Sequence, residues 1–152
     1  MENLLVAFTN APAYYPIIRT IKHADYLTTV AISFVACASF ISHLAENHKH
    51  GMPGIGFRPE TSYLLNRLDV IGCLITSARL VYCYCLKHGF GFQPIYQTPY
   101  LIMWTIITML LGRISEYDKY NPNLKHIYIP THCLWHISVF MLIDYFLSKL
   151  IY

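Results

Sequence analysis

The stretch Tyr26–Ala45, YLTTVAISFVACASFISHLA, is about 20 residues long and contains no Asp, Glu, Lys or Arg. An α-helix rises 1.5 Å per residue, so about 20 residues cover the roughly 30 Å hydrocarbon core of a bilayer. This stretch therefore predicts a membrane-spanning helix, which we place at about Ala24–Ala45, and it directs attention to the other apolar runs of the chain.

Three more apolar runs follow, separated by polar segments rich in Gly, Pro and Asn. We predict spans from Thr61 or Ser62 (a candidate N-cap) to Leu86, from Thr98 to Leu111, and from Ile127 to Tyr152. Residues 1–23 are apolar but interrupted by Pro12 and Pro16, so they are either a broken first span or an interfacial segment. The expected fold is all-α: residues 1–152 form a single polytopic transmembrane helix bundle with four firm spans.

Composition supports this interpretation. Hydrophobic residues make up 55% of the chain and charged residues 12%, and the mean hydropathy is +0.39. A soluble domain carries roughly 25% charged residues, so we expect a multi-pass integral membrane protein in contact with lipid. The net charge of +3 comes without a basic cluster interleaved with aromatic residues, so no nucleic-acid partner is expected. The first residues lack a basic n-region, and we expect no cleavable signal peptide.

The last apolar run begins with Thr131–Ser138, THCLWHIS, which carries His132 and His136. Two histidines four residues apart lie on one face of a helix, one turn apart. Such a pair can clamp one metal ion, because imidazole is the commonest metal-binding side chain near neutral pH. The alternative is a pair of core histidines that bind only other side chains.

Matching polar groups lie at the ends of two other predicted spans. Ser39 and His43, also four residues apart, close the first firm span, and Asp69 lies near the start of the second. If the first span ends at one membrane face, the second starts there, the third returns to it and the fourth starts there again. Ser39, His43, Asp69 and the histidine pair are therefore predicted to share one face of the membrane.

Three histidines with a nearby carboxylate fit a catalytic type of zinc site. His43, His132 and His136 would supply three ligands and leave a fourth position for water, whose pKa zinc lowers to about 7. Asp69 would orient that water or move its proton, and Ser39 would hydrogen-bond the water or a developing oxyanion. Each residue also has an ordinary alternative: Ser39 bonding a carbonyl of its own helix, Asp69 facing the helix dipole or water, and His43 lying in the interface.

The ordered set Ser39-x3-His43, Asp69 and His132-x3-His136 resembles the CREST superfamily of membrane hydrolases. This group includes alkaline ceramidases, adiponectin/progestin-type receptors, GPI-remodelling proteins and myomaker. Its pattern is SxxxH closing the second helix, Asp in the third and HxxxH opening the seventh. The present chain resembles a shortened form, since the loss of two helices before the last span keeps all the motifs on one face.

The resemblance implies a zinc-dependent hydrolase that cleaves an amide or ester bond of a lipid. A second hypothesis is a non-enzymatic fusion-type protein that keeps zinc as a structural element. A third is an accessory subunit of a larger membrane assembly that binds no metal. The substrate and the particular membrane stay open.

Two further expectations concern polar residues outside this set. Arg79 and Asp144 lie inside apolar runs at matching depths, about 15 Å below the proposed metal site, so we predict that they pair. The alternative is that Arg79 extends toward the far membrane face and Asp144 binds a hydroxyl or water. His48 and His50, in the polar segment after the first firm span, are expected to be solvated.

Overall fold

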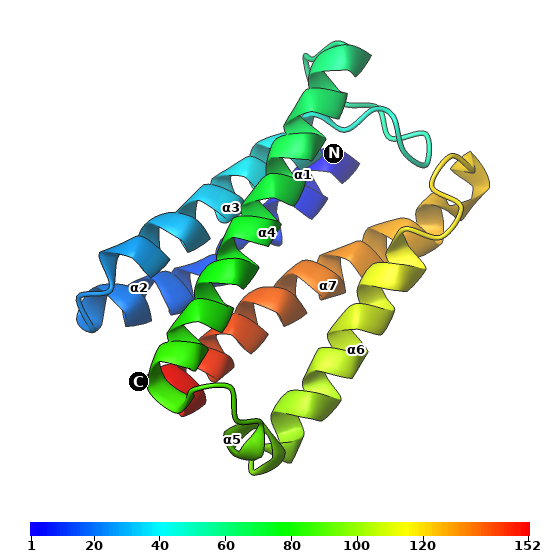
Figure 1. The fold of residues 1–152 in the computed structure, drawn as a ribbon. Helices are drawn as coiled ribbons and strands as arrows, with labels where there is room; N and C mark the ends of the chain where they lie inside the picture. Colours follow the sequence, from blue (N-terminus) through cyan, green and yellow to red (C-terminus); the bar gives the residue numbers. More distant parts are fainter.

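The computed structural model describes residues 1–152 and contains helices and turns but no strand (Figure 1). Three helical stretches, Tyr26–Ala45, Pro59–His88 and Pro122–Ile151, are long and apolar enough to cross a membrane, and Pro99–Ser115 is a shorter apolar helix. The elements in chain order are α1 (Glu2–Phe8), η1 (Ala11–Ala13), α2 (Tyr14–Lys22), α3 (Tyr26–Ala45), α4 (Pro59–His88), α5 (Gln93–Tyr96), α6 (Pro99–Ser115), η2 (Pro122–Leu124), α7 (Lys125–Phe146) and the π-helical turn η3 (Leu147–Ile151).

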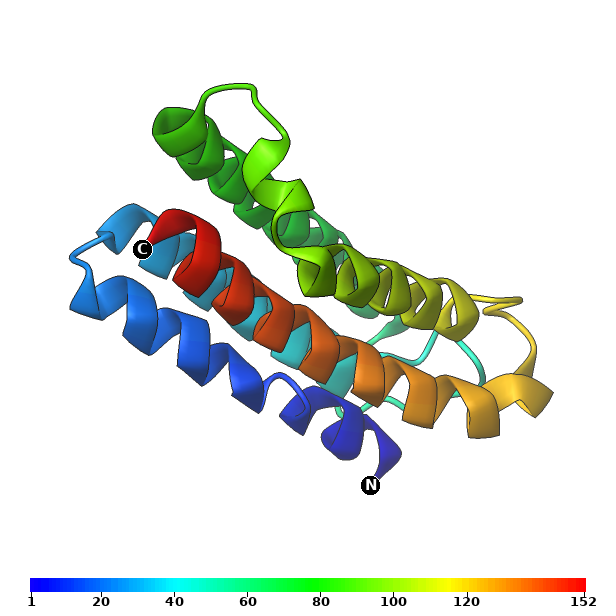
Figure 2. The same cartoon turned by 90° about the horizontal axis from the view of Figure 1, so that it is seen from below.

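The helices pack as two pairs that the N-terminal segment joins. α3 lies along α4 and α6 lies along α7, while α1 and α2 run beside both α3 and α7 (Figures 1 and 2). Gly72 of α4 allows the close approach to α3, because a Cβ there would lie 3.0 Å from the Cα of Val35. The main apolar core joins α3 to the C-terminal helix through Ile32, Val35, Phe140 and Leu147, all at most 5% exposed.

The predicted helix boundaries need local corrections. α4 begins at Pro59, before the predicted cap at Thr61 or Ser62, because proline has a suitable φ for the first helical position and needs no hydrogen-bond acceptor there. α6 continues past the predicted end at Leu111 to Ser115. α3 begins after Asp25, whose carboxylate accepts a bond from the Thr28 amide at 3.1 Å.

Residues 2–22 form two short helices broken at η1, which contains Pro12. This broken segment runs along the length of the bundle rather than across its end (Figure 2). Its first helix lies near the end of α3, where Asn3 donates from Nδ2 to the carbonyl oxygens of His43 and Glu46, each at 2.8 Å. We call this end of the bundle, which carries His43, the histidine end, and the other end the opposite end.

The predicted contact between Arg79 and Asp144 is wrong. Arg79 donates instead to the carboxylate of Asp25 and to the hydroxyl of Thr28, both at 2.9 Å. Asp144 accepts two bonds from Arg19, at 2.7 and 2.8 Å. Matching depth on α4 and α7 is not sufficient for pairing, because the N-terminal segment and the start of α3 supply nearer partners of opposite charge.

The loop between α3 and α4 also differs from expectation. His50 is buried at 1% exposure rather than solvated, and its Nε2 lies 3.2 Å from the carbonyl oxygen of Ser115. His48 is partly buried, and its Nδ1 lies 2.9 Å from the hydroxyl of Ser62. The loop packs against the segment after α6, where the amide of His50 donates to the Lys119 carbonyl at 2.6 Å. The loop therefore connects the end of α3 to the segment after α6 at the histidine end.

Candidate metal centre

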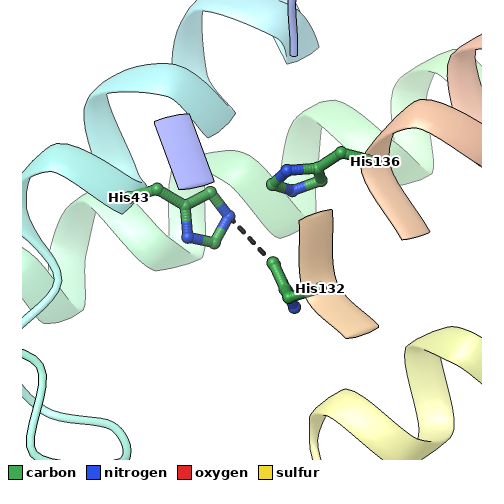
Figure 3. Close-up of side chains that lie close together, drawn as sticks. All are labelled: His43, His132 and His136. Carbon is green, nitrogen blue, oxygen red and sulfur yellow. Dashed lines mark hydrogen bonds between the residues drawn. The ribbon is translucent and has the colours of Figure 1, made fainter. Parts of the chain in front are cut away.

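The three predicted ligands meet at the histidine end. His43 comes from the last turn of α3, and His132 and His136 come from successive turns of α7 (Figure 3). All three are at most 3% exposed, and one ring nitrogen of each lies within 4.8 Å of the others. The Nε2 atoms of His43 and His132 are 3.2 Å apart. This group could hold a metal ion.

The Nδ1 atoms of the two α7 histidines each face a hydroxyl whose own proton is already used. Ser115 Oγ lies 3.1 Å from His132 Nδ1 and donates to the Gly112 carbonyl at 2.9 Å. Thr9 Oγ1 lies 2.9 Å from His136 Nδ1 and donates to the Val6 carbonyl at 2.5 Å. Because a hydroxyl has one proton, each oxygen accepts from the imidazole as long as its bond to the carbonyl is kept. We therefore assign the proton of His132 and of His136 to Nδ1.

His43 follows the same pattern with a charged partner. Its Nδ1 lies 3.2 Å from Oε2 of Glu46, and Tyr128 Oη donates to the same carboxylate oxygen. Burial alone raises the pKa of Glu46, but the contacts with His43, Lys49 and Tyr128 outweigh it and hold that pKa well below its ordinary value. An ionised carboxylate only accepts hydrogen bonds, so the His43 proton also belongs on Nδ1.

With these assignments the Nε2 atoms of His43 and His132 both carry lone pairs 3.2 Å apart, a contact that a cation between them would stabilise. The Nε2 atom of His136 lies 3.4 Å from the Ser39 hydroxyl. Zn–N bonds of about 2.0–2.1 Å place the nitrogens of a tetrahedral site about 3.3–3.4 Å apart. The His43–His132 pair is close to this spacing, and all three ligand atoms lie within 4.8 Å of one another. The group could hold a metal ion, and each ring has a second partner that fixes it, as metal-binding histidines ordinarily have.

The charges around the histidines also favour a cation. Two carboxylates, those of Glu46 and Asp69, face His43, and Lys49 lies between Glu46 and the partly exposed Glu116. Lys49 Nζ lies 2.9 Å from Glu116 and 3.5 Å from Glu46. Lys119 lines the same pocket as Glu116, so the three carboxylates exceed the two ammonium groups by one negative charge, which favours a cation.

Asp69 and Ser39 lie at the open side of the cluster. Oδ2 of Asp69 is 3.9 Å from Nε2 of His43, and Oγ of Ser39 is 3.4 Å from Nε2 of His136. Asp69 is 8% exposed and lies well inside α4, so it neither caps that helix nor faces bulk water. The Ser39 hydroxyl contacts the histidine rather than a carbonyl of its own helix. Both residues are therefore close enough to contact a fourth ligand.

Two pockets meet at this open side. One, of about 420 Å³, lies between α4 and α6 and includes the polar side chains of Lys49, Asn66 and Glu116. The other, of about 250 Å³, runs deeper between α3, α4 and α7 and is mainly apolar. Asp69 and Trp135 line both. The cluster is thus reached from a polar and from an apolar side.

Sequence reasoning missed the residues that hold the ligands. Glu46 had a readable signal, because it follows His43 by three residues at the end of the same helix. Asn3 and Thr9 of the N-terminal segment and Ser115 of α6 had none, since they lie far from the histidines in the sequence.

Comparison with known proteins identifies one relative. The chain is 53% identical over all 152 residues to an uncharacterized protein of Acanthamoeba polyphaga mimivirus, and the match covers the whole of both chains. No protein-family model matches the sequence. No solved structure matches it either. At this identity and coverage the chain belongs to the same family as the mimivirus protein.

Proposed function

We propose that the protein is a zinc-dependent integral-membrane hydrolase that cleaves an amide or ester bond of a lipid. The observation that carries the proposal is the buried group of three converging histidines beside Asp69, at the meeting of a polar and an apolar pocket. The resemblance to the CREST superfamily, in a shortened form, supports the same conclusion through the order and spacing of these residues.

The proposed topology has four spans, α3, α4, α6 and α7, with α1 and α2 as a broken span beside them. α6 has 17 residues, which give about 26 Å of helix and approach the thickness of the hydrocarbon core. Its pairing with α7 and its exposed apolar residues, such as Met103, Ile106 and Met109, support a span with a lipid-facing side. The histidine end would then lie near one membrane face.

The chain's own groups would divide the chemistry between them. Zinc, when bound, would supply Lewis-acid activation of a water near neutral pH. Asp69 would accept a proton at its carboxylate and return it to the leaving group, since it lies nearest the open side. Ser39 would donate a hydrogen bond to the substrate carbonyl as negative charge develops there.

The pockets indicate an amphiphilic substrate. An apolar chain would occupy the space lined by Val35, Leu80, Val139 and Phe140, while the polar group would face Lys49 and Asn66. The scissile bond would then lie beside Asp69, which borders both spaces.

A second candidate is a non-enzymatic membrane protein with a structural zinc. It is favoured by the number of segments that meet at the centre, because α3 and α7 provide the imidazoles while Thr9 and Ser115 bring in the N-terminal segment and α6. In that case zinc would hold four segments together and Asp69 would be dispensable.

The deciding experiment is metal analysis of the purified protein followed by hydrolysis assays on ceramide-type amides and phospholipid esters. We expect about one zinc per chain, and hydrolysis that Asp69→Asn abolishes while zinc is retained. Glu60→Gln, an exposed carboxylate on the same helix, is the matched control and should keep full activity. Zinc without hydrolysis of either substrate class would support the structural candidate, and a protein without zinc would overturn both.

A further inference from the structure

The three histidines differ in the charge of their outer partners. His132 and His136 donate to neutral hydroxyls, whereas His43 donates to the carboxylate of Glu46. Glu46 is 1% exposed and follows the last residue of α3. A carboxylate is buried this deeply only when interactions with other groups compensate for its lost hydration.

Glu46 is held by groups from three segments. Tyr128 of α7 donates to its Oε2, Lys49 Nζ lies 3.5 Å from its Oε1, and Asn3 Nδ2 bonds its backbone carbonyl. Tyr128 precedes His132 by four residues, so both lie on one face of α7. The Tyr128–Glu46–His43 chain therefore joins α7 to α3 directly beside the three converging nitrogens.

We propose that Glu46 is a positioning residue that fixes the ring of His43 and strengthens its Nε2 as a metal ligand. The inference rests on the proposed zinc site and adds a residue to it. A carboxylate that accepts the Nδ1 proton holds the imidazole in the form with a free Nε2 and increases the electron density there. Its negative charge also offsets part of the charge of a buried divalent ion.

The two carboxylate oxygens of Glu46 have different partners. Oε2 accepts hydrogen bonds from His43 and Tyr128, whereas Oε1 faces Lys49 without a hydrogen bond. An amide in its place keeps the shape but loses the charge. Glu46→Gln therefore isolates the electrostatic contribution to the metal ligand from packing.

The test compares Glu46→Gln with Glu116→Gln in the full-length protein in detergent. Both carboxylates contact Lys49, but only Glu46 reaches a histidine. With a chelator competition assay we expect Glu46→Gln to raise the Kd for zinc by about 10–100-fold, the range typical of outer partners of metal ligands. Glu116→Gln should change it by less than about threefold. The visible absorption of the cobalt(II) form should shift in Glu46→Gln only.

A purely structural role for Glu46 would lower the melting temperature of the metal-free protein without changing the cobalt spectrum, and it would overturn the inference. So would equal zinc affinities of the two variants in a protein that binds zinc. A wild-type protein that binds no zinc would instead overturn the proposed function itself. If Glu46→Gln does not fold, Tyr128→Phe provides the test, because it removes one bond to Glu46 and should weaken zinc binding by several-fold.

Discussion

The two ends of the bundle differ in how their polar side chains are paired. At the opposite end, which lies away from His43, Arg19 pairs with Asp144 and Arg79 pairs with Asp25, so the charges are matched across segments. Tyr152 donates a further bond to Asp25 at 3.0 Å. At the histidine end, three buried imidazoles converge instead. Buried side-chain atoms of Glu46, Asn47 and His48 at this end have no hydrogen-bond partner within the protein.

The difference separates stability from function. A buried polar group without a partner costs about 1–3 kcal/mol, so a fold retains such groups where another component compensates. The opposite end needs no ligand, because its ion pairs already satisfy one another. The histidine end contains a buried group of three histidines that could hold a metal ion. Breaking the opposite end should therefore affect folding alone, whereas breaking the histidine end should affect metal binding first.

The largest effect is expected from His132→Ala. Loss of one of three ligands should weaken zinc binding more than about 1,000-fold, on the order of 4 kcal/mol. Metal binding is coupled to folding, so zinc at 100 times the Kd should stabilise the wild type by about 2.7 kcal/mol and this variant not at all. Thermal unfolding with and without a chelator measures the difference. His126 is an exposed histidine of the same helix, and the chelator should lower the melting temperature of His126→Ala as much as that of the wild type. If the chelator lowers the melting temperature of His132→Ala by the same amount, His132 is not a ligand.

Arg79→Gln should have the next largest effect. Removing the guanidinium leaves the Asp25 carboxylate with fewer partners, and the cost should be about 1.5–3 kcal/mol of unfolding free energy, with no change in zinc affinity. A double-mutant cycle sharpens the corrected pairing. Arg79→Gln and Asp25→Asn should be coupled, whereas Arg79→Gln and Asp144→Asn should be additive. Weaker zinc binding in Arg79→Gln would show that the two ends are not independent.

Gly112→Ala tests the close approach of α6 to α7 near the histidine end. A Cβ at Gly112 would lie 2.7 Å from Nε1 of Trp135, so the indole must move. We expect a loss of about 1–2 kcal/mol and altered hydrolysis, because Trp135 lines both pockets. Gly91→Ala is the control, since a Cβ there meets nothing closer than 3.7 Å. Wild-type stability and turnover in Gly112→Ala would show that the indole position is unimportant.

The smallest effect is a pH dependence at the opposite end. Burial alone raises the pKa of Asp25, but bonds from Thr28, Arg79 and Tyr152 outweigh it and leave the pKa below the ordinary value of 3.8. The stabilisation by a depressed carboxylate is full above its unfolded-state pKa and is lost as the pH falls through the folded-state value. The stability difference between wild type and Asp25→Asn should stay constant down to about pH 4 and shrink below it. Chemical denaturation across this range measures it, and a difference that shrinks already between pH 7 and pH 5 would contradict the assignment.

Local sequence was sufficient for the helices. The all-helical fold and the long apolar helices are confirmed, because apolar runs of this length satisfy their backbone hydrogen bonds within the helix. The helix boundaries were less predictable, as Pro59 and Ser115 show. The proximity of His43 to the α7 histidines was also predictable, since motif positions near helix ends and the alternation of helix direction bring them to one end.

What the tertiary structure alone decided is which residues surround these motifs. Arg79 and Asp144 had the right depth to pair, yet Asp144 pairs with Arg19 of the N-terminal segment and Arg79 pairs with Asp25 at the start of α3. Thr9 and Ser115 fix the ring nitrogens of His136 and His132 from distant parts of the chain, and no spacing in the sequence encodes those contacts. Helix formation depends on neighbours within a few residues, whereas a hydrogen bond between segments depends on how whole helices pack.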